Sequence, residues 1–298
     1  MLTYVGMETD LIFTQGIDLP GFASYPLLET EAGRARLAGY YQALIAVARE
    51  AGVGAILESP TWVANRDRAA PLGYGPEQLR ALNVQAMDFL AQIRAATGYS
   101  PTLISANIGP RDDAYASEAQ MSAEEAEAYH AEQIGALSEG PVDVVTAYTL
   151  AYEAEAVGIA RAARAAGLPV VISFTCETDG RLPVGMTLAQ AIASVDAATN
   201  SYPAYYMVNC AHPDHLDGAF ADKPWMERVK GVVANASRCS HAELDAAEEL
   251  DAGDAVELGA QLGAIRARFP HITVLGGCCG TDMTHITEIA AHLGNPPR

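Results

Sequence analysis

The sequence predicts a (β/α)8 barrel, and two observations lead to this prediction. Eight short apolar runs alternate with longer alanine-rich helical patterns along the chain. Each run is almost continuously apolar rather than alternating, as expected of parallel strands that are buried on both faces. Eight strands, each followed by a helix, is the count of a closed barrel. A length of 298 residues suits one such unit, so we expect a single domain over residues 1–298.

The apolar runs place the expected strands, and the first of them carries the weakest signal. The eight runs are Leu2–Gly6, Val53–Ser59, Thr102–Gly109, Asp143–Leu150, Pro169–Cys176, Ala204–Ala211, Gly231–Ala236 and Ile272–Cys279. Barrel enzymes carry their chemistry at the carboxyl ends of the strands and in the loops that follow. The residues at the ends of these runs are therefore the first candidates for a functional site.

The helical patterns lie between the strands and are bounded by suitable residues. They are expected near residues 34–51, 76–98, 122–138, 152–167, 187–199, 213–223, 252–268 and 282–293. Ser122 with Glu125 predicts a capping box, and Pro76 suits a first helical turn. The glycines suited to helix ends are Gly98, Gly140 and Gly167. The sixth helix is short and carries Pro213 and Pro224, which weakens its signal.

A doubly wound open sheet is the alternative fold. However, no G-x-G-x-x-G pattern follows an early strand, and no P-loop pattern G-x-x-x-x-G-K-[ST] occurs in the chain. The glycine-rich segments therefore give no sign of dinucleotide or nucleotide binding, and the barrel remains the preferred fold.

The charge balance excludes several kinds of partner. Eighteen basic and 37 acidic residues give a net charge of −19, which argues against nucleic acid and anionic membranes as partners. No apolar stretch reaches the ~20 residues that a membrane span needs. The first residues carry neither a basic cluster nor a long apolar run, so we expect no signal peptide and a cytoplasmic protein.

The five cysteines point to a metal site rather than to disulfides. Cys210 ends the sixth expected strand, and the adjacent Cys278 and Cys279 end the eighth. Three thiolates can occupy three corners of a tetrahedral zinc site and leave the fourth open, which is the arrangement of a catalytic site. A redox or nucleophilic thiol is the alternative at this point. Cys176 and Cys239 are interpreted as small apolar side chains.

Several segments resemble the homocysteine S-methyltransferase family, and the resemblance covers nearly the whole chain. The matching segments are Val208-Asn209-Cys210, Gly276–Gly280 with Thr281, Ile108–Pro110 with Tyr115, Ser173–Leu182, and Asn235-Ala236-Ser237. The resemblance implies the barrel fold and a zinc ion held by Cys210, Cys278 and Cys279. It also implies methyl transfer from a sulfonium or quaternary ammonium donor to homocysteine, which gives methionine.

The departures from the family pattern concern the thiol acceptor. Tyr4 stands where the family has an aspartate near the bound homocysteine. Tyr148 stands where the family has a glutamate that holds the substrate's amino group. Glu8, Asp10, Glu58 or Glu177 would have to replace these carboxylates as substrate contacts. If none does, the acceptor lacks an α-amino group, because a buried ammonium without a partner is costly.

Three further residues are candidate substrate contacts. Trp62 follows the second strand, where the betaine-using branch of the family has an aromatic pair near its donor, although Val63 replaces the second aromatic. A tryptophan face would attract an onium group by cation–π interaction. Asn209 would orient the loop or donate a hydrogen bond to a thiolate. Asn235 lies in the turn that resembles the family's P-N-S-G segment.

The sequence therefore favours a zinc-dependent methyltransferase that acts on a small thiol and an onium donor. It selects neither the donor nor an oligomeric state, and it leaves no room for a separate corrinoid module. A second interpretation is a barrel hydrolase or lyase with a cysteine nucleophile, for which His212 or His215 would be the base. A third is a non-catalytic protein that binds zinc and a thiol metabolite.

Overall fold

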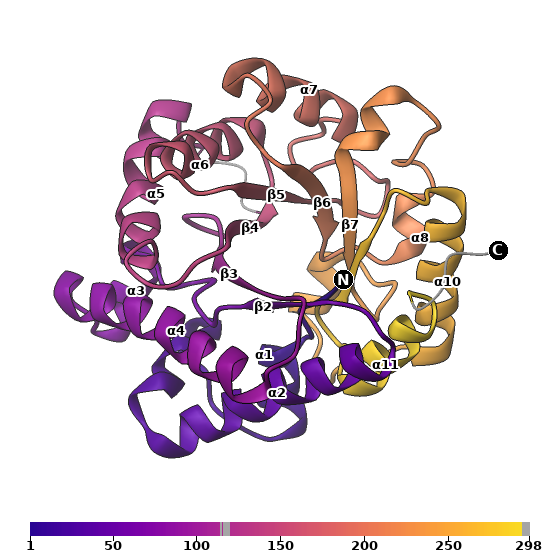
Figure 1. The fold of residues 1–298 in the computed structure, drawn as a ribbon. Helices are drawn as coiled ribbons and strands as arrows, with labels where there is room; N and C mark the ends of the chain where they lie inside the picture. Colours follow the sequence, from indigo (N-terminus) through magenta and orange to yellow (C-terminus); the bar gives the residue numbers. More distant parts are fainter. Residues whose placement is uncertain (114, 116–119, 294–298) are drawn as a thin grey trace.

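The structure, a computed structural model, describes residues 1–113, 115 and 120–293. Its eight parallel strands pair in chain order, and β8 pairs with β1 to close the barrel. The helices surround the strands (Figure 1). The predicted (β/α)8 barrel is confirmed, and the open-sheet alternative is wrong because every strand in the closed sheet has two neighbours.

Each strand overlaps its expected run. The strands are β1 Leu2–Thr3, β2 Ala55–Glu58, β3 Thr102–Ile108, β4 Val144–Leu150, β5 Val170–Thr175, β6 Tyr205–Asn209, β7 Val229–Ala234 and β8 Val274–Gly277. The expectation for β1 was too long, since it extended to Gly6. The chain leaves the sheet at Tyr4, whose φ of 33° cannot continue a strand. The short helix α1 (Met7–Thr9) follows at once.

Eight α-helices correspond to the expected helical patterns. They are α2 Glu31–Glu50, α4 Pro76–Thr97, α5 Ala123–Leu137, α6 Glu153–Ala165, α7 Leu188–Thr199, α8 Pro213–Leu216, α10 Ala255–Arg268 and α11 Met283–Ala291. Helix α8 is much shorter than the expected 213–223, because Gly218 disfavours continuation and Pro224 begins a separate 3-10 turn.

Short helical segments occupy the loops. These are α3 Arg66–Ala69, α9 His241–Asp245, a π-helical turn Asp10–Thr14, and the 3-10 turns Pro20–Phe22, Tyr25–Glu29, Ala70–Leu72 and Pro224–Arg228. The sequence patterns gave no signal for them, because one helical turn carries too few residues to show a periodicity.

Two of the predicted helix boundaries illustrate different uses of glycine. The capping box of Ser122 and Glu125 is present, and Gly98 ends α4 in the left-handed conformation with φ of 59°. Gly140 does not cap α5, whose last residue is Leu137 and whose C-cap is Ser138. A side chain at Gly140 would instead overlap Met87, so this glycine permits close packing of α5 against α4.

The core has an outer layer between strands and helices and an inner layer inside the barrel. The inner layer contains Ile56, Val171, Met207 and Val233, and it reaches upward to Tyr148 and Cys278. The barrel interior is therefore filled, and its packed upper surface forms the base of the candidate site. None of the described helices is long and apolar enough to cross a membrane.

Candidate metal centre and its cavity

Three cysteines from the ends of two strands meet at the carboxyl end of the barrel. Cys210 follows β6, and Cys278 and Cys279 follow β8, with β7 between these strands. Their three sulfur atoms lie within 4.8 Å of one another. The structure thus brings together the three residues that the sequence selected as metal ligands.

The backbone around the cysteines is held in an unusual conformation by neighbouring strands. Cys210 has a φ of 53°, which costs a non-glycine residue roughly 1–2 kcal/mol. Its N–H donates to the carbonyl of Val233 (3.2 Å), and the N–H of Cys278 donates to that of Ala234 (2.7 Å). Strand β7 therefore fixes both ligand-bearing segments. A side chain at Gly277 would overlap Thr281, which explains the glycine before the paired cysteines.

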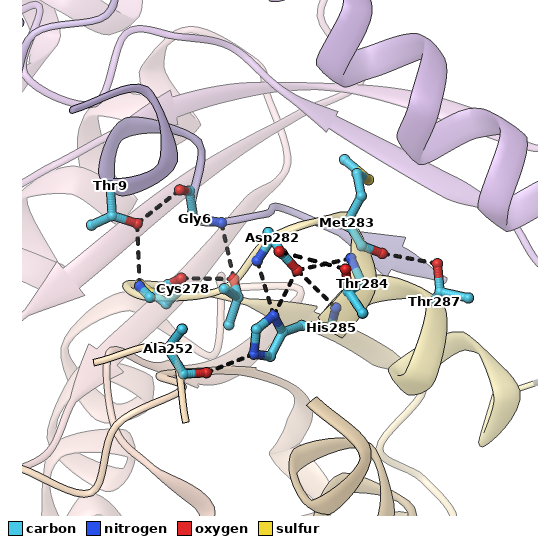
Figure 2. A network of polar contacts seen from close by, with 11 residues as sticks. Gly6, Thr9, Ala252, Cys278, Asp282, Met283, Thr284, His285 and Thr287 are labelled. Carbon is cyan, nitrogen blue, oxygen red and sulfur yellow. Dashed lines mark hydrogen bonds and ion pairs between the residues drawn. The ribbon is translucent and has the colours of Figure 1, made fainter. Parts of the chain in front are cut away.

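Hydrogen bonds tie the loop after β8 to the loop after β1 (Figure 2). The N–H of Gly6 donates to Oγ1 of Thr281 (3.0 Å), and the Thr281 hydroxyl donates to the carbonyl of Cys278 (2.7 Å). The N–H of Gly280 donates to Oγ1 of Thr9 (3.2 Å), which in turn donates to the carbonyl of Gly6 (2.8 Å). The cysteine pair is therefore positioned by the first loop as well as by its own strand.

Asn209 links the cysteine cluster to the neighbouring strands. Its Nδ2 donates to the sulfur of Cys210 (3.3 Å) and to Oγ1 of Thr149 (2.8 Å). Its Oδ1 accepts from the N–H of Thr149 (2.9 Å) and the hydroxyl of Ser173 (2.7 Å). Asn209 thus lies beside the sulfur with its amide oriented by β4 and β5. Thr149 was missed by the sequence analysis; it has a φ of 64° where the β4–β5 register shifts.

The donor set of the cluster fits a zinc ion. Contact with the sulfur of Cys210, together with burial, raises the pKa of the Cys278 thiol well above its usual value. Three such sulfurs would not ionise together without a cation to neutralise them. Three thiolates with an open fourth position are a donor set that zinc prefers.

A small inner cavity of about 50 Å³ lies against the cluster. It is lined by Tyr4, Gly6, Glu8, Thr9, Phe22, Trp62, Asn107, Tyr148, Thr149, Asn209, Cys210, Cys278 and Cys279. An outer cavity of about 580 Å³ shares Thr9, Phe22, Trp62, Thr149, Cys210 and Cys279 with it. The cluster therefore faces a narrow space that opens into a wider one.

The first tyrosine that departs from the family pattern is paired with a glutamate in the inner cavity. The hydroxyl of Tyr4 donates to Oε2 of Glu8, and the hydroxyl of Ser24 donates to Oε1 of the same carboxylate (2.7 Å). Burial raises the pKa of Glu8 despite these bonds. Among the sequence-predicted carboxylates, Glu8 is the one that lines the cavity.

The second tyrosine is also paired with a glutamate, but this glutamate lies deeper. The hydroxyls of Tyr148 and Thr3 both donate to Oε1 of Glu58 at 2.9 Å. Glu58 is only 3% exposed, and burial raises its pKa. It lines neither the inner nor the outer cavity among the described residues, because Tyr148 lies between it and the inner one. The rings of Tyr4 and Tyr148 lie 5.9 Å apart.

Trp62 lines both cavities and contacts a charged group of the protein itself. The Arg68 guanidinium lies 5.3 Å from the centre of its ring, and Phe22 packs edge-on at 6.3 Å. The Nε1 atom of Trp62 is buried without a hydrogen-bond partner among the described residues. One face of the indole is thus already used by a cation, while its polar edge is unpaired.

Two asparagines also present unpaired oxygens. Asn235 lines the outer cavity, and Asn107 lines the inner one. Within the described part of the chain, the Oδ1 atom of each is buried and accepts no hydrogen bond. Asn107 was not among the residues predicted from the sequence. Its available signal was a polar residue near the end of the otherwise apolar run of β3, at the carboxyl end of the barrel.

Glu177 and two histidines lie away from the site. Within the described part of the chain, Glu177 lines neither cavity, because its N–H closes a turn with the carbonyl of Arg181 (2.8 Å). His212 accepts from the N–H of Asp214 (3.2 Å) as the cap of α8. His215 contacts the carbonyl of Arg238 (3.0 Å). In the described part of the chain neither histidine lines the inner or the outer cavity, so the structure does not place either of them as a base beside the three cysteines.

The fold and the site together define a (β/α)8 barrel protein with a three-cysteine cluster at the carboxyl ends of its strands. The model of one family, homocysteine S-methyltransferase, matches residues 36–293. The chain belongs to this family, as its sequence motifs predicted. The search of curated proteins found no match.

Solved structures of the homocysteine methyltransferase MmuM from Escherichia coli share the fold. The oxidised form is 20% identical, with a TM-score of 0.71, and the alignment covers 98% of this chain and 95% of that one. The metallated form is 19% identical, with a TM-score of 0.69 and coverage of 98% and 94%. The apo form is 19% identical, with a TM-score of 0.64 and coverage of 98% and 95%.

Proposed function

We propose that the protein is a zinc-dependent methyltransferase that acts on a small thiol, with Cys210, Cys278 and Cys279 as the zinc ligands. The observation that carries the proposal is the convergence of these three sulfurs at the base of a cavity. The metallated form among the structural neighbours adds support. When bound, zinc would lower the pKa of the acceptor thiol, so that the thiol is ionised at neutral pH.

The chain's own residues would prepare the transfer. Asn209 donates a hydrogen bond to the sulfur of Cys210 and holds it in place. The inner cavity would confine the acceptor next to the cluster, and the outer cavity would hold the methyl donor. Confinement in adjoining spaces aligns two reactants and removes much of the entropic barrier.

The transfer itself balances without a covalent enzyme intermediate. A bond forms between the acceptor sulfur and the methyl carbon, while the bond from that carbon to the sulfonium sulfur or quaternary nitrogen breaks. The electron pair of the broken bond stays on the donor and neutralises its positive charge. The proton of the acceptor thiol passes to solvent.

Two measurements test this proposal together. The first is the zinc content of the full-length protein purified without chelators. The second is a screen of thiols against S-methylmethionine, S-adenosylmethionine and betaine, with the methylated thiol detected by mass spectrometry. One zinc per chain and a methylated thiol are the expected results. Protein that contains no zinc, or zinc-loaded protein that methylates no thiol with any of these donors, would overturn the proposal.

A further inference from the structure

We propose that the acceptor is a short, uncharged thiol whose hydroxyl or carboxamide is bound by Asn107 and Trp62. Amino acid thiols such as homocysteine would be poor acceptors. This inference rests on the proposed thiol methylation at Cys210, Cys278 and Cys279, and it names the class of acceptor. It follows from the charges, the unpaired polar atoms and the size of the inner cavity.

The inner cavity offers no free charge to either end of an amino acid. Among its described lining residues there is no lysine or arginine, so a carboxylate would find no counter-ion there. Both oxygens of Glu8 already accept hydroxyl donors, from Tyr4 and Ser24. An ammonium would therefore compete with two hydroxyls, and Glu58 lies outside the cavity lining. Burying either charge without a free partner is costly.

Two of the residues that line the inner cavity carry a buried, unpaired polar atom, one an acceptor and the other a donor. Asn107 is 2% exposed, and its Oδ1 accepts no hydrogen bond from the described residues. Nε1 of Trp62 is buried and likewise donates none. Buried polar groups of this kind are normally paired, so their lack of partners points to a ligand.

Both unpaired atoms lie at the carboxyl end of β3. Asn107 is the second-to-last residue of this strand, and Gly109, directly after the strand, donates its N–H to the carbonyl of Trp62 (2.8 Å). A Cβ at Gly109 would lie 2.5 Å from Nε1 of Trp62, so the indole N–H packs against the strand end. A hydroxyl or a carboxamide both donates and accepts, and so matches the pair. An amino acid could pair with both atoms only by placing its ammonium on the oxygen and its carboxylate on the N–H, and both charges would then have to be desolvated in the cavity.

The size and the walls of the cavity point to the same class. A cavity of about 50 Å³ holds roughly three or four water-sized groups. This suits 2-mercaptoethanol, whereas homocysteine has about twice as many non-hydrogen atoms. The rings of Tyr4 and Tyr148, 5.9 Å apart, provide an apolar surface for a short carbon chain. The residues that replace the family's carboxylates thus make the acceptor site aromatic.

Calorimetric binding of thiols to the zinc-loaded full-length protein tests the inference without a donor. The probes are 2-mercaptoethanol, 3-mercaptopropionamide and L-homocysteine. We expect the two neutral thiols to bind at least about tenfold more tightly than homocysteine. The reason is that a neutral thiol gains a well-placed hydrogen bond and does not require a charge to be buried. Tighter binding of homocysteine would overturn the inference and leave the proposed function intact. Binding of none of the three would count against both.

If Asn107 and Trp62 had a purely structural role, changing them would not alter the ratio of the dissociation constants for neutral thiols and for homocysteine. Variants of both residues therefore test the binding role through this ratio. Asn107→Asp places a carboxylate in the cavity, and we expect it to weaken the neutral thiols about tenfold and to favour homocysteine. Trp62→Phe keeps an aromatic ring but removes the N–H, and is expected to lower the affinity for neutral thiols alone. Gln78→Glu, the same amide-to-carboxylate change on the exposed face of α4 and outside both cavities, is the matched control and should leave the ratio unchanged. An unchanged ratio in both test variants would contradict the assignment.

Discussion

The two sides of the barrel mouth differ in how closely they follow the family pattern. On the side of β6 and β8, Cys210, Cys278 and Cys279 match the family motifs and converge. On the side of β1 and β4 lie the two tyrosines that the sequence predicts to replace carboxylates of the family, and each is bonded to a glutamate. The proposed metal centre and the proposed acceptor site are therefore built from different strands. The acceptor site can change its chemistry while the three cysteines are kept.

The largest effect is expected from the metal side. Cys278→Ala removes one of three sulfurs, so we expect zinc to be lost and methyl transfer to fall by more than about 100-fold. Metal analysis and the mass-spectrometric assay measure both quantities. Cys239→Ser is the matched control, because Cys239 is exposed and separate from the cluster. Full zinc content and turnover in Cys278→Ala would show that this side of the mouth does not hold the metal.

A smaller loss is expected from the residue that supports the cluster. Asn209→Asp keeps an oxygen for Thr149 and Ser173 but replaces the donor to Cys210 with a negative charge. Zinc affinity should fall about 10- to 100-fold, as for other residues that support metal ligands. Competition with a chromophoric chelator measures this affinity. An unchanged zinc affinity would mean that the hydrogen bond to the sulfur does not tune the metal.

A change on the acceptor side should alter specificity and leave the metal in place. Tyr4→Phe removes the hydroxyl that donates to Glu8, so one carboxylate oxygen becomes free for an ammonium. We expect homocysteine to bind several-fold more tightly, as one uncovered hydrogen-bonding site would give, with zinc content unchanged. Calorimetry with homocysteine and metal analysis check the two parts. Loss of zinc in this variant would show that the two sides are not separable.

The buried pair of Tyr148 and Glu58 allows a test of the stability of the fold, and we expect little effect on the metal. The pKa of Glu58 is raised in the folded protein, so this residue keeps its proton to a higher pH than it does in the unfolded chain. Its favourable contribution is therefore full below its unfolded pKa and is lost as the pH rises through the folded value. Glu58→Gln cannot ionise, and should become more stable relative to the wild type as the pH rises from 4 to 8. The gain is about 1.4 kcal/mol for each unit of pKa shift.

Denaturant unfolding of both proteins across this pH range checks the prediction. A stability difference that does not change with pH would show that Glu58 titrates alike in the folded and unfolded chains. A difference that changes in the opposite direction would indicate that the folded protein stabilises the ionised carboxylate.

The sequence by itself determined the barrel and the place of the cysteine cluster. Continuously apolar runs report burial on both faces, which is a local property of each strand. The barrel rule then places every strand end at one rim, so residues as distant as Cys210 and Cys278 could be assigned to one centre before any contact was known. The glycines next to the cysteines could also be predicted, because they belong to the same sequence motif.

Only the tertiary structure decided the roles of the polar residues around that centre. Glu8, Glu58 and Glu177 looked alike in the sequence, yet one lines the inner cavity, one lies beneath Tyr148, and one is drawn into a turn. Asn107 gave little signal in the sequence, although it lines the inner cavity and its oxygen is buried without a partner among the described residues. The physical reason is that a side chain's partners at a strand end depend on loop paths and on backbone torsions such as that of Tyr4. These are set by contacts between segments far apart in the chain.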